Sequence, residues 1–188
     1  MSDFVFGHDC VILDACCVIN LYATDRMGEI LRAAPVKFAV SSYVQINEAR
    51  WVYNGEDADG NTLKQPIDLH PLVEAKLLEI VEPDLTALGE QMILFASHDI
   101  PNGEVISAAI AHQRNWAIGT DDIGASKKFA GLVPHLQIVS TFDLIKHWAI
   151  LDGIDHDGIR TALRKIRHRG RFNISEHHPL YEWSRNYG

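Results

Sequence analysis

The sequence predicts an α/β fold: a three-layer α/β/α sandwich around a central parallel sheet of four or five strands, with a C-terminal helical extension. Short apolar runs alternate along the chain with segments of helical periodicity, a pattern typical of parallel strands joined by helical crossovers. The length of 188 residues and the 47% content of hydrophobic residues suit one compact domain with room for a small appendage.

The predicted strands are continuous apolar runs, as expected for strands that are covered on both faces of a parallel sheet. They span residues 11–13, 37–40, 78–81, 116–119 and 136–139. Apolar residues at helical spacing predict helices between them, over residues 27–34, 42–53, 85–96, 104–114, 126–132 and 142–151.

Two segments fall outside this alternation. Residues 54–70 contain Gly55, Gly60 and Pro66 and are predicted to form an inserted surface loop or hairpin. Residues 1–150 are therefore predicted to form one domain, and residues 151–188 a helical extension. The extension has an apolar helical face formed by Ile159, Leu163 and Ile166 and an aromatic tail with Phe172, Tyr181, Trp183 and Tyr187. These apolar groups predict that it packs on the domain or on a second subunit.

Several classes of protein do not fit the composition. No apolar run approaches the roughly 18 residues that span a bilayer, and the N-terminus does not resemble a signal peptide, so we expect a cytoplasmic protein without a membrane association. The three cysteines, Cys10, Cys16 and Cys17, cluster in the first apolar segment and are expected to be reduced core residues. The His177-His178 pair lacks partners at zinc-ligand spacing.

The formal net charge of -8 conceals one basic segment, which runs from Arg160 to Arg171 without an acidic residue. On the predicted helix, Arg160, Arg164 and Arg167 share the face opposite the apolar one and form a candidate phosphate-binding stripe for a nucleic acid. The alternative is the ordinary charged surface of an amphipathic helix.

Carboxylates follow two of the predicted strands. Asp14 ends the first apolar run, and Asp121 and Asp122 follow the fourth. Open parallel sheets bind ligands outside the carboxyl ends of their strands, where the strand order reverses. Asp14 as a helix cap, and the aspartate pair as a turn, are the structural alternatives. Convergence of several such groups favours a functional site.

Glu48 belongs to the predicted helix 42–53. At helical spacing it shares a stripe with Val44, Trp51 and Val52, which predicts an inward-pointing side chain. The alternative is a glutamate at the edge of the core, or one paired with a basic neighbour.

Glu104 opens the predicted helix 104–114, where the helix dipole alone would favour a carboxylate. If Asp14, Glu48, Glu104 and Asp121 meet in one crevice, their repulsion is expected to raise their pKa values, and a divalent cation would relieve it. Oxygen ligands select hard ions, so the sequence predicts Mg²⁺ or Mn²⁺ and hydrolysis of a phosphodiester by metal-activated water.

The order of these motifs over residues 9–147 resembles the PIN-domain nucleases, which include the VapC-type toxins of toxin-antitoxin pairs. The motifs are Val11-Ile12-Leu13-Asp14 with Asn20 six residues later, Gln45-Ile46-Asn47-Glu48, Glu104-Val105-Ile106-Ser107-Ala108-Ala109 and Gly119-Thr120-Asp121-Asp122. Ala15 stands where the family usually has Ser or Thr, and Glu104 stands where it usually has Asp. The segment from Ile154 onward resembles the C-terminal part of a less-studied PIN subgroup.

The resemblance implies an endoribonuclease that binds Mg²⁺ or Mn²⁺ and hydrolyses RNA. It also implies a homodimer and, for a toxin, inhibition by an antitoxin protein. We therefore hypothesise that Asp14, Glu48, Glu104 and Asp121 form the catalytic group. The hypothetical metal ligands are Asp14, Glu104, Asp121 and Asp122, with Asn20 and Thr120 supporting them and Glu48 acting as a ligand or orienting the attacking water.

Three alternatives stay open at this point. A catalytically silent PIN fold would serve as a regulatory module or would bind RNA or protein. An aspartyl-phosphate enzyme is disfavoured because Cys16 occupies the place of its second Asp. A nucleotide-binding oxidoreductase is disfavoured because no Gly-rich turn follows the first strand.

Overall fold

The computed structural model describes residues 4–98 and 100–187. Its main sheet has five parallel strands in the order β5-β2-β1-β6-β7, which confirms the predicted fold class. The strands are β1 (Cys10–Leu13), β2 (Lys37–Ser41), β5 (Glu79–Val81), β6 (Ala117–Gly119) and β7 (Ile138–Val139), close to the five predicted runs.

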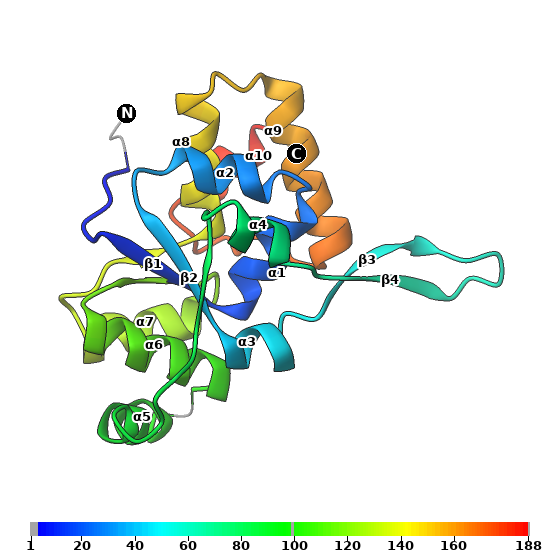
Figure 1. Ribbon diagram of the computed structural model, residues 1–188. Helices are drawn as coiled ribbons and strands as arrows, with labels where there is room; N and C mark the ends of the chain where they lie inside the picture. The colour runs from blue at the N-terminus through cyan, green and yellow to red at the C-terminus, as the bar shows by residue number, and fades with distance from the viewer. Residues whose placement is uncertain (1–3, 99, 188) are drawn as a thin grey trace.

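Helices cover both faces of this sheet (Figure 1). One layer contains α1 (Ala15–Ala23), α2 (Met27–Ala33), α8 (Thr141–Leu151) and α9 (His156–Lys165). The other contains α5 (Gly89–Ala96), α6 (Asn102–Arg114) and α7 (Ile123–Leu132). The remaining described helices are the short helices α3 (Ser42–Asn47), α4 (His70–Glu74) and α10 (Tyr181–Arg185) and the π-helical turn η1 (Ile166–Gly170).

Strand β1 shows why the sheet needs two layers. Successive side chains of a strand point to opposite faces. Val11 and Leu13 accordingly pack into the core under α1, α2 and α8, whereas Cys10 and Ile12 pack into the core over α5, α6 and α7. All four are buried, which explains the unbroken apolar run in the sequence.

The prediction of one helix over residues 42–53 was wrong. Helix α3 ends at Asn47, and the amides of Glu48 and Ala49 both bond to the carbonyl of Val44. Strand β3 (Trp51–Glu56) then begins, because aromatic and β-branched residues favour an extended chain when a partner strand is present.

That partner is β4 (Thr62–Pro66), which pairs antiparallel with β3. The predicted insertion is thus a hairpin, but it starts at residue 51 and not at 54. It projects from the body of the protein, with its tip far from the main sheet (Figure 1). Asp57 closes the tip by accepting hydrogen bonds from the Asn61 amide (2.8 Å) and side chain (3.0 Å).

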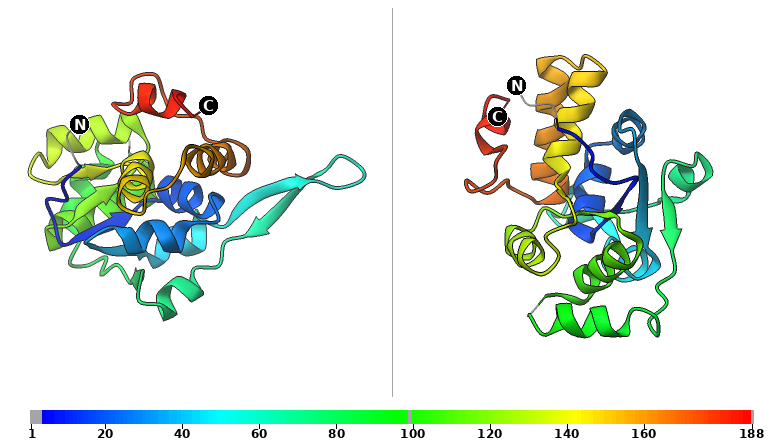
Figure 2. Two further views of the ribbon diagram at one scale, coloured as in Figure 1. Left: turned by 90° about the horizontal axis from the view of Figure 1, so that it is seen from above. Right: turned by 90° about the vertical axis from the view of Figure 1, so that its left-hand side faces the viewer.

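The C-terminal region packs on the layer of α1 and α8. Ile159, Leu163 and Ile166 are buried in the same core as those helices, as the apolar face predicted. At Gly170, a Cβ atom would lie 2.7 Å from Oδ1 of Asn20, so η1 approaches α1 more closely than another residue would allow. Figure 2 shows α10 lying beside α8 and α9.

Arg169 joins η1 to two other parts of the chain. Its guanidinium donates to the carbonyls of Ala23 (3.0 Å) and Tyr53 (3.4 Å), donates to Oε1 of Gln65 (2.7 Å), and forms an ion pair with Asp25. Only 13% of the Arg169 side chain is exposed, so water has little access to its bonding partners. If the side chain is removed, these partners therefore lose their hydrogen bonds without full replacement by water.

We therefore expect Arg169→Ala to lower the free energy of unfolding by about 2–4 kcal/mol. Urea denaturation followed by circular dichroism measures this change. Arg32→Ala is the matched control, because Arg32 is exposed on α2, and it should change the free energy by less than about 0.5 kcal/mol. Equal effects of the two substitutions would contradict the structural role of Arg169.

Within residues 4–98 and 100–187, no helix is long and apolar enough to span a bilayer.

Candidate metal centre

The candidate site lies where the strand order reverses. From β1 the chain proceeds to β2 and β5 on one side of the sheet, while β6 and β7 lie on the other. Because β1 and β6 are neighbours, their carboxyl ends bring Asp14 and Asp121 to the same edge. The amide of Asp14 bonds to the carbonyl of Gly119 (2.8 Å), which continues the β1-β6 pairing up to Asp14.

Asp14 is 2% exposed and has two different environments at its oxygens. Oδ1 accepts a bond from the amide of Ala15 (2.6 Å), so the predicted capping role at α1 is real. Oδ2 lies near the side chains of Cys16 (3.4 Å) and Thr120 (3.4 Å). Burial, opposed by these bonds and reinforced by nearby negative charges, raises the pKa of Asp14 to about 6.

Asp121 is also buried, and its carboxylate is already hydrogen-bonded. Oδ1 accepts from the amide of Thr141 (2.8 Å), and Oδ2 accepts from the Thr141 hydroxyl (2.6 Å) and from Nδ2 of Asn20 (2.7 Å). Burial raises the pKa of Asp121, and these bonds oppose the rise. Asn20, which the sequence analysis assigned a supporting role, thus contacts Asp121 directly.

Glu104 lies in the first turn of α6 and has the most perturbed carboxylate of the group. Burial raises the pKa of Glu104 to about 8, and the charges of Asp14, Asp122 and Glu48 add to the effect. Its Oε2 is buried and has no hydrogen-bond partner among the described residues. An unpaired buried oxygen on an acidic group is costly, and a bound cation is one way to satisfy it.

Glu48 reaches the same region, although the argument from helical spacing was wrong because Trp51 and Val52 belong to β3. It is the C-cap residue of α3, and its Oε1 accepts a bond from the amide of Gly103 (3.1 Å). Burial raises the pKa of Glu48, and this bond opposes the rise. The contact with α6 accounts for the proximity of Glu48 to Glu104.

Gly103 is the residue that permits this contact. A Cβ atom at position 103 would overlap the Glu48 carboxylate. We expect Gly103→Ala to displace the flexible end of Glu48 and to break its bond to the Gly103 amide, and therefore to lower the free energy of unfolding by about 0.5–1.5 kcal/mol.

Gly131→Ala is the matched control, because Gly131 lies in α7 with nothing within 4 Å of an added Cβ. This substitution should be neutral or stabilising by about 0.5–1 kcal/mol. Thermal melts of both variants measure the difference. A Gly103→Ala protein as stable as the control would contradict the close contact.

The remaining predicted residues fall into two places. Thr120 contacts Asp14. Asp122 is exposed and caps α7 by accepting a bond from the amide of Ala125 (2.8 Å), which is the structural role that the alternative for the aspartate pair gave it. The negative charge of Asp122 nevertheless contributes to the raised pKa of Glu104. The arginines of the predicted stripe lie on α9 and η1, outside this group of carboxylates.

The carboxylates form a loose group and not a tight ligand set. Among the described residues, the one group of three His, Cys, Asp or Glu side chains with ligand atoms within 4.8 Å of one another is Cys16, Cys17 and Asp121. There, burial raises the pKa of Cys17, and Asp121 already holds three bonds. The three thiols are free, with Cys10 and Cys17 buried and Cys16 partly buried.

The acidic group nevertheless fits a hard cation. The candidate ligands Asp14, Glu48 and Glu104 offer carboxylate oxygens, and Mg²⁺ is commonly held by one or two carboxylates together with several waters. Like charges that repel one another also explain why the carboxylates stay apart.

Three residues of this region were not identified as site residues from the sequence. Thr141 follows the last strand at the same sheet edge as Asp14, and that position could have indicated it. Cys16 was interpreted as a core residue, although its sulfur contacts Asp14 and accepts a bond from the Asp121 amide (3.2 Å). Gly103 had no signal beyond its place before Glu104.

Comparisons with protein-family models, with curated proteins and with solved structures found no match to this chain.

Proposed function

We propose that this protein is a Mg²⁺- or Mn²⁺-dependent endoribonuclease that hydrolyses phosphodiester bonds of RNA, as its resemblance to the PIN-domain nucleases implies. The observation that carries the proposal is the Oε2 atom of Glu104, which is buried and without a hydrogen-bond partner among the described residues, beside the charges of Asp14, Glu48 and Asp122. A divalent cation would stabilise such a carboxylate by pairing its unbonded oxygen and by reducing the repulsion from the neighbouring charges.

In this proposal Asp14 and Glu104 hold the cation. Oδ2 of Asp14 is the atom assigned to the cation, because it accepts only long bonds from Cys16 and Thr120 (both 3.4 Å), whereas Oδ1 holds the 2.6 Å bond that caps α1. A bound Mg²⁺ or Mn²⁺ would lower the pKa of a coordinated water and stabilise negative charge on the phosphate. Glu48, held in place by the Gly103 amide, is a ligand or orients the attacking water.

Asp121 has a second role in the proposal, which is to fix the sheet edge. Three of the roughly four lone-pair positions of its carboxylate accept bonds from Asn20 and Thr141. Asp121 can thus offer one further position to a cation while it ties β6 to α1 and α8. Asp122 adds negative charge at the outer side of Glu104.

The direct test combines metal binding with cleavage. Purified protein is incubated with a mixed RNA pool in Mg²⁺, in Mn²⁺ or in chelator, and Mn²⁺ binding is measured in parallel by calorimetry. We expect Mn²⁺ binding together with cleavage that stops in chelator. Protein that neither binds Mn²⁺ nor cuts RNA would contradict the proposal.

A second candidate is a catalytically silent PIN-type module that binds RNA or protein. The extensive hydrogen bonding of Asp121 favours it, since a carboxylate that already accepts three bonds is a weaker metal ligand. Mn²⁺ binding without cleavage of any RNA in the pool would select this candidate.

A further inference from the structure

A cavity of about 530 Å³ lies between α9, η1, the first turn of α8 and the C-terminal tail. Its volume falls within the range of small-molecule sites, roughly 300–1,000 Å³. It is separate from the acidic group, because none of the four predicted catalytic carboxylates lines it. The two regions are nevertheless neighbours, since Thr141 bonds to Asp121 while the next residue, Phe142, lines the cavity.

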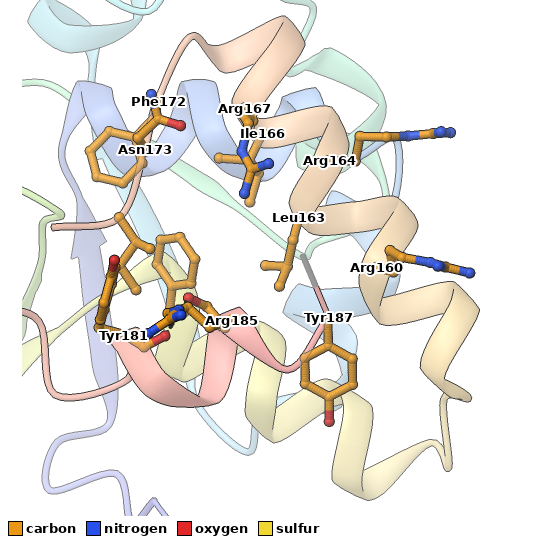
Figure 3. A pocket seen from close by; sticks show the side chains of 13 residues that line it. Arg160, Leu163, Arg164, Ile166, Arg167, Phe172, Asn173, Tyr181, Arg185 and Tyr187 are labelled. Atoms are coloured by element: carbon orange, nitrogen blue, oxygen red, sulfur yellow. Dashed lines mark hydrogen bonds between the residues drawn. The ribbon is translucent and has the colours of Figure 1, made fainter. Parts of the chain in front are cut away.

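Two guanidinium groups give the cavity a cationic part. Arg167 projects from η1 toward the cavity, and Arg185 reaches it from α10 (Figure 3). No acidic side chain among the described residues pairs with Arg167. Arg185 lies 3.7 Å from the exposed Glu182, and its guanidinium lies over the Tyr181 ring, 5.8 Å from the ring centroid. Guanidinium groups at a cavity are suited to phosphate, which accepts their paired hydrogen bonds.

The three arginines of the predicted phosphate-binding stripe do not all point toward the cavity. The side chains of Arg160 and Arg164 also border the cavity, but their guanidinium groups extend away from it (Figure 3). Arg160 pairs with Asp157 at 2.5 Å. Of the three predicted arginines, Arg167 alone is thus directed at the cavity, and the sequence did not single out its partner Arg185.

Most of the remaining lining is aromatic and apolar. Phe142, Phe172, Tyr181 and Tyr187 contribute rings, and Leu163 and Ile166 contribute aliphatic side chains. Tyr187 is held in place by the His156 and Trp183 rings, with centroids 5.0 and 5.2 Å away. Flat faces of this kind stack on nucleobases, and each stacked base contributes roughly 1–3 kcal/mol. Asn173 adds an amide that can donate to and accept from a base edge.

We propose that this cavity binds one nucleotide, with its phosphate at Arg167 and Arg185 and its base against Tyr187 and the neighbouring rings. A ligand with one anionic end and one flat apolar end matches both the arginines and the rings of the cavity, whereas inorganic phosphate or a nucleoside matches only one of the two. The nucleotide is a free mononucleotide or one unit of an RNA strand. This inference does not depend on RNA cleavage, because binding can be measured without metal.

The test is calorimetry on the full chain in chelator with uridine and adenosine 5′-monophosphates, the two nucleosides, inorganic phosphate and a short RNA. We expect a mononucleotide to bind more tightly than either half alone. Arg167→Ala should weaken binding about tenfold or more, as expected for lost bonds to a charged group. Tyr187→Leu should weaken the binding of the nucleotide but leave the binding of inorganic phosphate unchanged.

Arg164→Ala is the matched control, because it removes the same charge from α9, directly before η1, at a guanidinium that points away from the cavity. It should change the affinity by no more than about twofold. Tighter binding of the short RNA than of the mononucleotide, with the same dependence on Arg167, identifies a strand as the ligand, and equal affinities identify a free nucleotide. The absence of nucleotide binding at millimolar concentration, or equal effects of Arg164→Ala and Arg167→Ala, would overturn the proposal.

Discussion

Asp14→Asn is expected to reduce metal-dependent RNA cleavage by at least about 100-fold, a size typical for the loss of one well-placed electrostatic group. The substitution removes the negative charge at Oδ2, which the proposal assigns to the cation, and preserves the size of the side chain. Oδ1 can still accept the bond from the Ala15 amide, so the start of α1 should be kept. Cleavage of a labelled RNA in Mn²⁺ measures the rate.

The same variant should be folded and at least as stable as the original protein in chelator. Burial and the charges of Glu48 and Asp121 raise the pKa of Asp14, so neutralising it relieves repulsion. Asp152→Asn is the matched control, because Asp152 is exposed at the end of α8 and should retain full activity. An Asp14→Asn protein that cuts RNA at the original rate would remove Asp14 from the mechanism.

The fold was predictable because the central strands β1 and β6 are buried on both faces. Unbroken apolar runs such as 11–13 leave few alternatives to a parallel strand between helices. The hairpin was less predictable, since residues 42–53 carry apolar groups at spacings that fit a helix. Strand β3 forms there because β4, which begins at Thr62, supplies its hydrogen bonds, and the pattern within residues 42–53 does not contain that partner.

The proximity of the carboxylates was predictable to the extent that it depends on strand ends. Asp14 and Asp121 follow neighbouring strands, so topology alone brings them to one edge. Glu48 was assigned correctly to the acidic region from an incorrect spacing argument, and its true position depends on the contact with Gly103. The separate bonding of Asp121 to Asn20 and Thr141 depends on tertiary packing, which no local motif specifies.

The second large effect is expected in the pH dependence of stability. In the absence of metal, burial raises the pKa of Glu104 from 4.5 to about 8. Between these values the folded protein binds more protons than the unfolded chain, so stability falls as pH rises. Glu104 is expected to lower the free energy of unfolding on the order of 3 kcal/mol between pH 5 and pH 8.5, which corresponds to roughly 5–10 °C in the melting temperature.

Glu104→Gln isolates this contribution, because glutamine does not titrate and all other groups remain. The difference in melting temperature between the two proteins in chelator should be small near pH 5 and should grow toward pH 8.5, with the variant more stable. Mn²⁺ at 1,000 times its dissociation constant should reverse the order at high pH, since it then stabilises the folded state by about 4.1 kcal/mol, which exceeds the cost of about 3 kcal/mol from ionised Glu104. Parallel pH curves for the two proteins, with and without Mn²⁺, would show that Glu104 is neither strained by charge nor a ligand. The proposed metal ligands would then be reduced to Asp14 and Glu48.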